Sequence, residues 1–258
     1  MPSPSRVKHP VCIEICIDSV ASAIAAERGG ADRIELCSNL RVGGTTPSAG
    51  LIEVVRAGTS LDVQVMVRPR SGDFCYSAEE FEIMLRDVLA ARQFGANGVV
   101  LGLLKEDGRI DVTRTRELVE LAHPLRVTFH RAFDLCCDLE CDVKRALESV
   151  ILTGADRVLT SGGKPTAMEA RSILTNLVQA AEGRITILSC GGIDASNAAT
   201  IVRDTGVTEI HAGLRRALRN AKPAHTQVSL EVEHESEVQR FEVREEDVRN
   251  LRSAVDAA

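Results

Sequence analysis

The segment GGADRIELC, residues 29–37, contains the pattern that decides the fold of this chain. In it, a glycine suited to the left-handed end of a helix precedes a short turn and an apolar strand. The same order recurs in FGANGVVLG (94–102), TGADRVLTSGG (153–163) and TGVTEIHAG (205–213). This weak internal repeat predicts that helices and strands alternate along the sequence.

Four further apolar segments bring the expected strands to eight: VCIEICID (11–18), VQVMVRP (63–69), LRVTFHR (125–131) and RITILSCGG (184–192). Helical patterns separate the strands over residues 19–28, 48–58, 77–94, 112–122, 140–152, 166–181 and 194–204. Such alternation predicts an α/β protein with a parallel sheet, and eight units in about 250 residues match a closed (β/α)8 TIM barrel. The alternative is a doubly wound open sheet, which would place a glycine-rich loop after the first strand, where ICIDSVAS has none.

We expect one TIM-barrel domain over residues 1–258. The barrel units occupy 10–211, an extended loop over the barrel mouth follows strand eight at 212–244, and the last outer helix covers 245–256. A loop of that length inside a domain is usually functional or disordered.

Polar residues at helix starts support the expected helices. Ser19 is a plausible N-cap, and Ser77 with Glu80 forms a Ser-x-x-Glu capping box. For the helix at 194–204, the expected cap is Asp194 or Ser196.

The composition is that of an ordinary globular protein and argues against several classes of partner. The 258 residues are 44% hydrophobic and carry a net charge of −6. No basic stripe is present, so we expect no nucleic-acid partner. No apolar run approaches the roughly 18 residues that span a bilayer, so we expect no membrane partner. The polar N-terminal segment 1–10 has no signal-peptide core, which favours a cytosolic or nucleocytoplasmic location.

The first two strands place acids and thiols on the same side. Glu14 and Cys16 are two residues apart, as are Glu35 and Cys37, so each pair shares one face of its strand. Isoleucine and leucine take the other faces, a pattern that fits barrel strands. The two thiols should then lie at similar heights about 5 Å apart, which suits Cu(I) or two packed thiols equally.

Charged side chains at the strand ends are candidates for an active site, because TIM barrels place their active sites there. Glu14, Glu35, Arg68 and His130 are the candidate catalytic residues, with His130 as general acid or base. A structural alternative remains open, in which Arg68 and Arg33 only neutralise the two buried glutamates.

A second set of residues could hold a small phosphorylated or carboxylated ligand. Arg68 and Arg70 could hold the anionic group, because arginines bind such groups well, and the glycine turns SGG and CGG offer backbone N–H groups to an anion. Glycine is also needed simply to turn the chain, so this signal is weak. The candidate ligand-binding residues are Arg70, Ser161, Gly162, Gly191, Gly192 and His211.

The other cysteines have less specific interpretations. Without a signal peptide, most are expected to be free thiols, and Cys12 is expected in the core. The segment CCDLEC (136–141) holds three cysteines, but no second close pair completes a zinc-ribbon spacing. We therefore do not expect a structural zinc site there.

Several motifs together resemble the CutC copper homeostasis protein family. They are EICIDSVASA (14–23), ERGGADRIELCSNLRVGGTTPS (27–48), VMVRPRSGDFCYS (65–77), VTFHRAFD (127–134), RVLTSGG (157–163) and TEIHAG (208–213). The resemblance runs from about Cys12 to His211 and implies a TIM barrel. It also implies a cytosolic protein, partly nuclear in animals, that forms dimers or tetramers and takes part in copper tolerance.

The resemblance further implies Cu(I) binding at Cys16 and Cys37, which match the two cysteines credited with copper in animal members. The family has also been suspected of an unidentified enzymatic activity. The chain departs from the family pattern at Cys190, which could add a third thiol, and at AGLRRALR after His211. Three hypotheses follow: a Cu(I)-binding protein of copper homeostasis, an enzyme of small anionic substrates in which copper is incidental, or a scaffold that works through its oligomer surfaces. No motif defines a reaction, so the sequence leaves open whether the chain is an enzyme.

Overall fold

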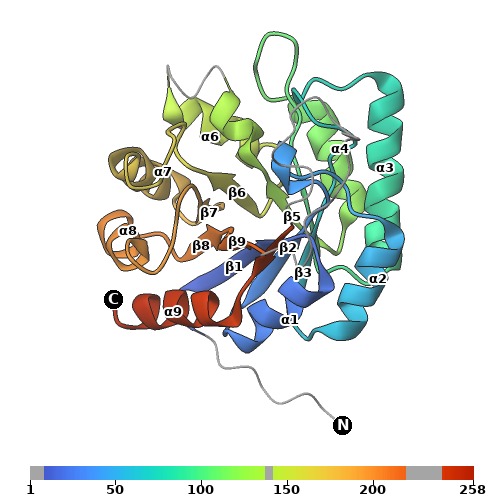
Figure 1. The fold of residues 1–258 in the computed structure, drawn as a ribbon. Coiled ribbons are helices and arrows are strands. Elements are labelled where there is room, and N and C mark those ends of the chain that lie inside the picture. Colours follow the sequence, from blue (N-terminus) through green and yellow to red (C-terminus); the bar gives the residue numbers. More distant parts are fainter. Residues whose placement is uncertain (1–8, 137–141, 219–239) are drawn as a thin grey trace, which may run out of the picture.

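The strands close into a parallel barrel in the computed structural model, which describes residues 9–136, 142–218 and 240–258. Each strand pairs with the next in sequence, and the eighth pairs with the first (Figure 1). This confirms the predicted TIM barrel. The strands are β1 (Cys12–Ile17), β2 (Arg33–Leu36), β3 (Asp62–Met66), β4 (Gly98–Leu101), β5 (Arg126–Phe129), β6 (Arg157–Thr160), β7 (Thr186–Ser189) and β8 (Glu209–Ala212).

Helices surround this ring of strands (Figure 1). They are α1 (Val20–Arg28), α2 (Ala49–Gly58), α3 (Ala78–Gln93), α4 (Val112–Ala122), α6 (Val143–Ile151), α7 (Arg171–Ala181), α8 (Ala198–Thr205) and α9 (Glu245–Asp256). Two short 3-10 helices, η1 (Leu40–Val42) and η2 (Arg131–Leu135), lie after β2 and β5. No helix in the described parts of the chain is both long and apolar enough to cross a membrane.

The two faces of the strands differ as the period-2 pattern predicts. Ile13, Ile15 and Ile17 of β1 are at most 1% exposed and belong to the large apolar cluster that also includes helix residues. Glu14, on the opposite face, is fully buried inside the barrel. Apolar packing between strands and helices thus forms the main core, and the barrel interior is left for polar groups.

The repeated glycines end helices as expected. Gly30, Gly95, Gly154 and Gly206 all have positive φ, between 74° and 88°. A residue with a Cβ is strained in this region, so glycine sets the turn from each helix into the following strand.

Two of the predicted helix caps are confirmed. The Ser19 hydroxyl accepts a hydrogen bond from the Ser22 N–H, and Ser77 with Glu80 forms the complete capping box at α3. The predicted caps of α8 are wrong, because that helix begins only at Ala198. The Asp194 carboxylate instead accepts hydrogen bonds from the backbone and hydroxyl of Ser196, in a turn before the helix.

Other boundaries shift for similar local reasons. Helix α7 begins five residues later than predicted, because Thr166 and Glu169 form a hydrogen-bonded turn before it. Helix α6 begins at Val143, with Asp142 as its N-cap. The first residues of its predicted range, and Cys137 and Cys141 of the CCDLEC segment, lie outside the described residues.

The segment after β8 contains strand structure that the sequence did not predict. Strand β9 (Arg215–Ala217) pairs antiparallel with β10 (Phe241–Val243), close to the start and end of the predicted 212–244 loop. Residues 219–239 lie outside the described residues. The final helix, α9, has the predicted bounds 245–256.

A Ser77→Ala variant should lower the free energy of unfolding by about 1 kcal/mol, because it removes the side-chain acceptor for the Glu80 N–H. Urea unfolding followed by circular dichroism measures this change. Ser71→Ala is the matched control, since Ser71 is exposed and lies outside a helix. Equal losses in the two variants would show that the capping box contributes nothing specific.

Candidate metal and ligand site

A cavity of about 720 Å³ opens at the carboxyl ends of the strands. Its wall includes residues from β1, β2, β3 and β8, from the turns after β5 and β7, and from the β9–β10 pair. Leu214, Arg215 and Phe241 line it. The segment after β8 therefore does contribute to the barrel mouth, through its two described ends.

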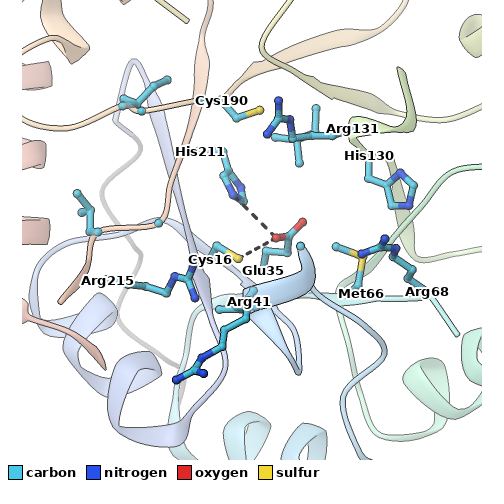
Figure 2. A pocket seen from close by; sticks show the side chains of 18 of the residues that line it. Cys16, Glu35, Arg41, Met66, Arg68, His130, Arg131, Cys190, His211 and Arg215 are labelled. Atoms are coloured by element: carbon cyan, nitrogen blue, oxygen red, sulfur yellow. Dashed lines mark hydrogen bonds and ion pairs between the residues drawn. The ribbon is translucent and has the colours of Figure 1, made fainter. Parts of the chain in front are cut away.

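Two thiols converge on one carboxylate at the wall of this cavity. Cys16 and Glu35 line the cavity (Figure 2), and Cys37 is fully buried beside them. The Cys16 thiol donates to Glu35 Oε2 at 3.1 Å, and the Cys37 thiol approaches the same oxygen at 3.6 Å. One ligand atom from each of the three residues lies within 4.8 Å of the others. This is a group of donors that could hold a metal ion.

The strand register behind this group differs from the expected one. Cys16 stands opposite Glu35 in the β1–β2 pairing, so Cys37 lies further along its strand than Cys16 does. The prediction that the two thiols lie at similar heights is wrong at the level of the backbone, because strands in a closed barrel are staggered. The side chains of Cys16 and Cys37 nevertheless both reach Oε2 of Glu35.

The buried glutamates are held by a network in the barrel interior. Arg33 donates to Glu14 at 2.5 Å and to Glu209 at 2.6 Å, and His211 Nδ1 lies 2.8 Å from the other oxygen of Glu14. His211 Nε2 is 3.9 Å from Glu35 (Figure 2). Of the two arginines expected to neutralise Glu14 and Glu35, only Arg33 does so, and it pairs with Glu14.

These contacts set the protonation of the acids and of the histidine. Burial favours neutral Glu14, but the Arg33 guanidinium and His211 outweigh burial and lower the pKa of Glu14 to about 2. Burial raises the pKa of Glu35 above its ordinary value. Burial also opposes a charge on His211, but Glu35, Cys16 and Glu14 together raise its pKa well above the usual range. We infer an ionised Glu14 beside a protonated His211 at neutral pH.

Both thiols of the group hold their protons at neutral pH. Contact with Cys37, burial and the nearby Glu35 carboxylate all raise the pKa of Cys16. Contact with Cys16 lowers the pKa of Cys37, but burial and Glu35 outweigh that effect and raise it to about 11. A metal ion that binds here must therefore displace thiol protons.

Arg68 also lines the cavity, but its guanidinium binds backbone carbonyls of two loops and no carboxylate among the described residues. Its side chain donates to the carbonyl oxygens of Val42, Gly44 and Gly72 at 2.8–2.9 Å. The prediction that Arg68 neutralises Glu14 or Glu35 is therefore wrong. The loop after β2 supplies two of these carbonyls, so Arg68 fixes the loop that carries the diglycine.

His130 lies beside Arg68 and is neutral. Its Nδ1 accepts a hydrogen bond from the Ala132 N–H at 3.2 Å. Burial, reinforced by the Arg68 charge, lowers the pKa of His130 to about 3. The Phe74 ring contacts both residues, at 4.7 Å between ring centroids for His130 and 4.9 Å from the Arg68 guanidinium carbon.

The other candidate ligand residues divide into two groups. Gly191, Gly192 and His211 line the cavity. Arg70, Ser161 and Gly162 are not among the lining residues. Arg70 binds Glu80 and Asp73 at the start of α3.

The SGG turn after β6 is occupied by the chain itself. Asp134 accepts hydrogen bonds from the N–H groups of Ser161 and Gly163, and the Gly162 N–H donates to Thr160. These backbone groups are therefore not directed at a ligand, in contrast to the sequence expectation for Ser161 and Gly162.

Some residues of the cavity were missed by the sequence reasoning. Met66 shares a strand face with Arg68, so the period-2 pattern that selected Arg68 could have selected it too. Arg41 lies in the quoted loop after β2 but was not singled out. Phe241 carried no signal, because its place at the mouth depends on the pairing of β10 with β9.

His130 should make the fold acid-sensitive. The unfolded histidine takes up a proton below pH 6.5, whereas the folded one resists protonation down to about pH 3. Stability should therefore fall as pH falls through this window, by up to about 1.4 kcal/mol per pH unit from this group. Urea unfolding of wild type and His130→Asn across the window measures the difference. Asparagine keeps an acceptor for Ala132 without a titratable ring, so parallel pH profiles would contradict the prediction.

The fold and site define a class of protein: a (β/α)8 barrel whose mouth carries two buried thiols beside a carboxylate. Among barrels, the chain belongs to the CutC family, whose sequence model matches residues 11–215. The chain is 47% identical to the human copper homeostasis protein cutC homolog over 203 residues, 79% of this chain and 73% of the human protein. It is 44% identical to a family protein CutC of Chromobacterium violaceum, over 95% of this chain and 98% of the relative.

A solved structure supports the same assignment. The crystal structure of the putative copper homeostasis protein CutC from Streptococcus agalactiae superimposes with a TM-score of 0.73 at 32% identity. The match covers 78% of this chain and 97% of that one. The family that the sequence motifs indicated is thus confirmed.

Proposed function

We propose that this chain binds Cu(I) through the sulfur atoms of Cys16 and Cys37 and acts in copper handling. The observation that supports this most is the convergence of both thiols on Glu35, with one donor atom from each residue within 4.8 Å of the others. Soft thiolates favour Cu(I), which accepts low coordination numbers. The human and mouse relatives are named copper homeostasis proteins, which agrees with this choice of metal.

The surroundings of the two thiols also fit Cu(I). Cys16 and Cys37 belong to an apolar cluster with Leu40, Met66 and Val100 inside the barrel. The thioether of Met66 is itself a soft group, and the aliphatic side chains limit contact with water. A sulfur-rich site in apolar surroundings favours Cu(I) over harder ions that prefer oxygen ligands.

Glu35 and His211 can handle the protons that Cu(I) displaces. Glu35 Oε2 already accepts from the Cys16 thiol, so it is the nearest acceptor when the sulfur loses its proton. His211 lies between Glu35 and Glu14 and lines the cavity. Because its ring is protonated at neutral pH, His211 must release a proton to the cavity before it can take one from Glu35.

An anaerobic titration of the reduced protein against a chromophoric Cu(I) competitor tests the proposal. We expect the protein to withdraw a single Cu(I) per chain, and X-ray absorption at the copper edge to show sulfur ligands. If the competitor keeps all the metal, or if the absorption shows only nitrogen and oxygen ligands, the proposal is wrong. A parallel titration with Mg²⁺, which prefers oxygen ligands, is the negative control. The cytosolic location and the homo-oligomeric state implied by the family stay predictions.

A further inference from the structure

Two buried nitrogen atoms on one wall of the cavity have no hydrogen-bond partner among the residues that the structure describes. They are Nε of Arg68 and Nε2 of His130. Both residues line the cavity, with Arg68 5% and His130 3% exposed. Eight other buried side-chain atoms of the described residues are also unpaired, among them the hydroxyl of Tyr76, which interacts with Arg68. Buried polar groups in proteins are nearly always paired, so this group of unpaired atoms around Arg68 and His130 points to a partner from outside the chain.

Both nitrogens are donors. An arginine Nε always carries a hydrogen. His130 Nδ1 accepts from the Ala132 N–H, so the proton of the neutral ring must be on Nε2. The lowered pKa of His130 agrees with a neutral ring. The missing partner is therefore an acceptor.

The charge at this wall specifies the acceptor further. Arg68 is a buried cation, and within the described ranges no carboxylate forms an ion pair with it. Its terminal nitrogens bind three backbone carbonyls, and its side chain also interacts with the neutral hydroxyl of Tyr76. Leaving a cation buried without an anion is strongly unfavourable. Arg215 and Arg131, the latter paired with Asp134, line the same cavity and add positive charge, against the carboxylates of Glu35 and Asp194.

We propose that this wall binds one oxygen of a small oxyanion, a carboxylate or a phosphate, through Arg68 Nε–H and His130 Nε2–H. The ring of Phe74, which packs on both residues, also lines the cavity and offers an apolar surface to the carbon skeleton of the ligand. A cavity of about 720 Å³ has room for a small metabolite. Figure 2 shows Arg68 and His130 to one side of Glu35 and Cys16. The site does not depend on copper.

Calorimetric titration of the metal-free protein with inorganic phosphate and, separately, with malonate tests this proposal. Sodium chloride at matched ionic strength controls for general screening. We expect binding of at least one of the two probes beyond the chloride control, and the tighter probe identifies the class of oxyanion. If neither probe binds at millimolar concentration, the proposal is overturned.

The His130→Asn variant assigns the binding to this wall. Asparagine retains an acceptor for the Ala132 N–H but lacks the Nε2 donor, so we expect probe affinity to fall by about 10-fold or more. His9→Asn is the matched control, because His9 lies outside the cavity and should leave the affinity unchanged. Wild-type affinity in His130→Asn would overturn the proposal.

A measurement on the wild-type protein tests the same site even if the His130→Asn variant does not fold. In nitrogen NMR, the Nε2–H resonance of His130 should shift when the preferred probe is added, and an unchanged resonance at saturation would count against the site. The Cys16→Ser/Cys37→Ser protein should still bind the probe. Failure of copper binding and failure of oxyanion binding are therefore separate results.

Discussion

An Arg33→Met variant is expected to lose about 3–5 kcal/mol of unfolding free energy, which is the usual cost of removing one partner from a buried ion pair. Arg33 is 4% exposed and bridges Glu14 and Glu209 inside the barrel. Burial opposes its charge, but the carboxylates outweigh burial and raise the pKa of Arg33 above its usual value. Methionine has a similar length and no charge, so the variant isolates the loss of the cation from the loss of packing.

Urea unfolding at neutral pH measures this loss. Arg86→Met is the matched control, because Arg86 and Glu82 form an exposed pair on α3 that should contribute less than about 1 kcal/mol. Adding Glu14→Gln to Arg33→Met removes one stranded charge and should restore part of the stability. If Arg33→Met costs no more than Arg86→Met, the interior network does not stabilise the fold.

Much of the fold could be predicted from the sequence because its signals are local. The positive φ at the end of a helix is a requirement of a single residue, and glycine meets it without strain. The repeat is therefore visible in the sequence as Gly30, Gly95, Gly154 and Gly206. The alternation along β1 and β2 is equally local. It places Glu14 and Cys16, and then Glu35 and Cys37, inside the barrel without knowledge of the neighbouring strands.

The partners of these side chains could not be predicted in the same way, because they depend on register and on loops. Arg68 shares the interior face with Gln64 and Met66, yet its guanidinium turns to carbonyls of two loops. The stagger of the closed barrel places Arg33, not Arg68, beside Glu14.

Contacts between residues far apart in the chain also determine whether the N–H groups of the glycine turns are available to a ligand. The SGG turn is a phosphate-site candidate by its sequence alone. In the structure, the carboxylate of Asp134 accepts hydrogen bonds from the backbone N–H groups of this turn, at Ser161 and Gly163. Asp134 lies 27 residues before Ser161 in the chain, so its contact with the turn could not be inferred from the local sequence. The unpaired N–H groups of Arg68 and His130 could not be predicted from the sequence either. That a hydrogen-bond partner is missing can be seen only once the positions of all surrounding residues are known.

A Cys16→Ser/Cys37→Ser variant is expected to lose Cu(I) binding almost completely. Both sulfurs are replaced by harder hydroxyl oxygens, which are poor ligands for Cu(I). Loss of an outer-shell partner alone already weakens metal sites by about 10–100-fold, so losing both thiolates should cost more than about 100-fold in affinity. Competition against a chromophoric Cu(I) chelator measures the ratio of affinities under anaerobic conditions.

Cys190→Ser is the matched control for this prediction. Cys190 is a buried thiol that lines the same cavity, but the potential metal-binding groups among the described residues do not include it. Its substitution should leave the Cu(I) affinity unchanged, whereas a drop comparable with that of the double variant would make it a third ligand. Circular dichroism must show that the double variant is folded, since both serines are buried. A folded double variant that binds Cu(I) as tightly as wild type would place the copper site elsewhere.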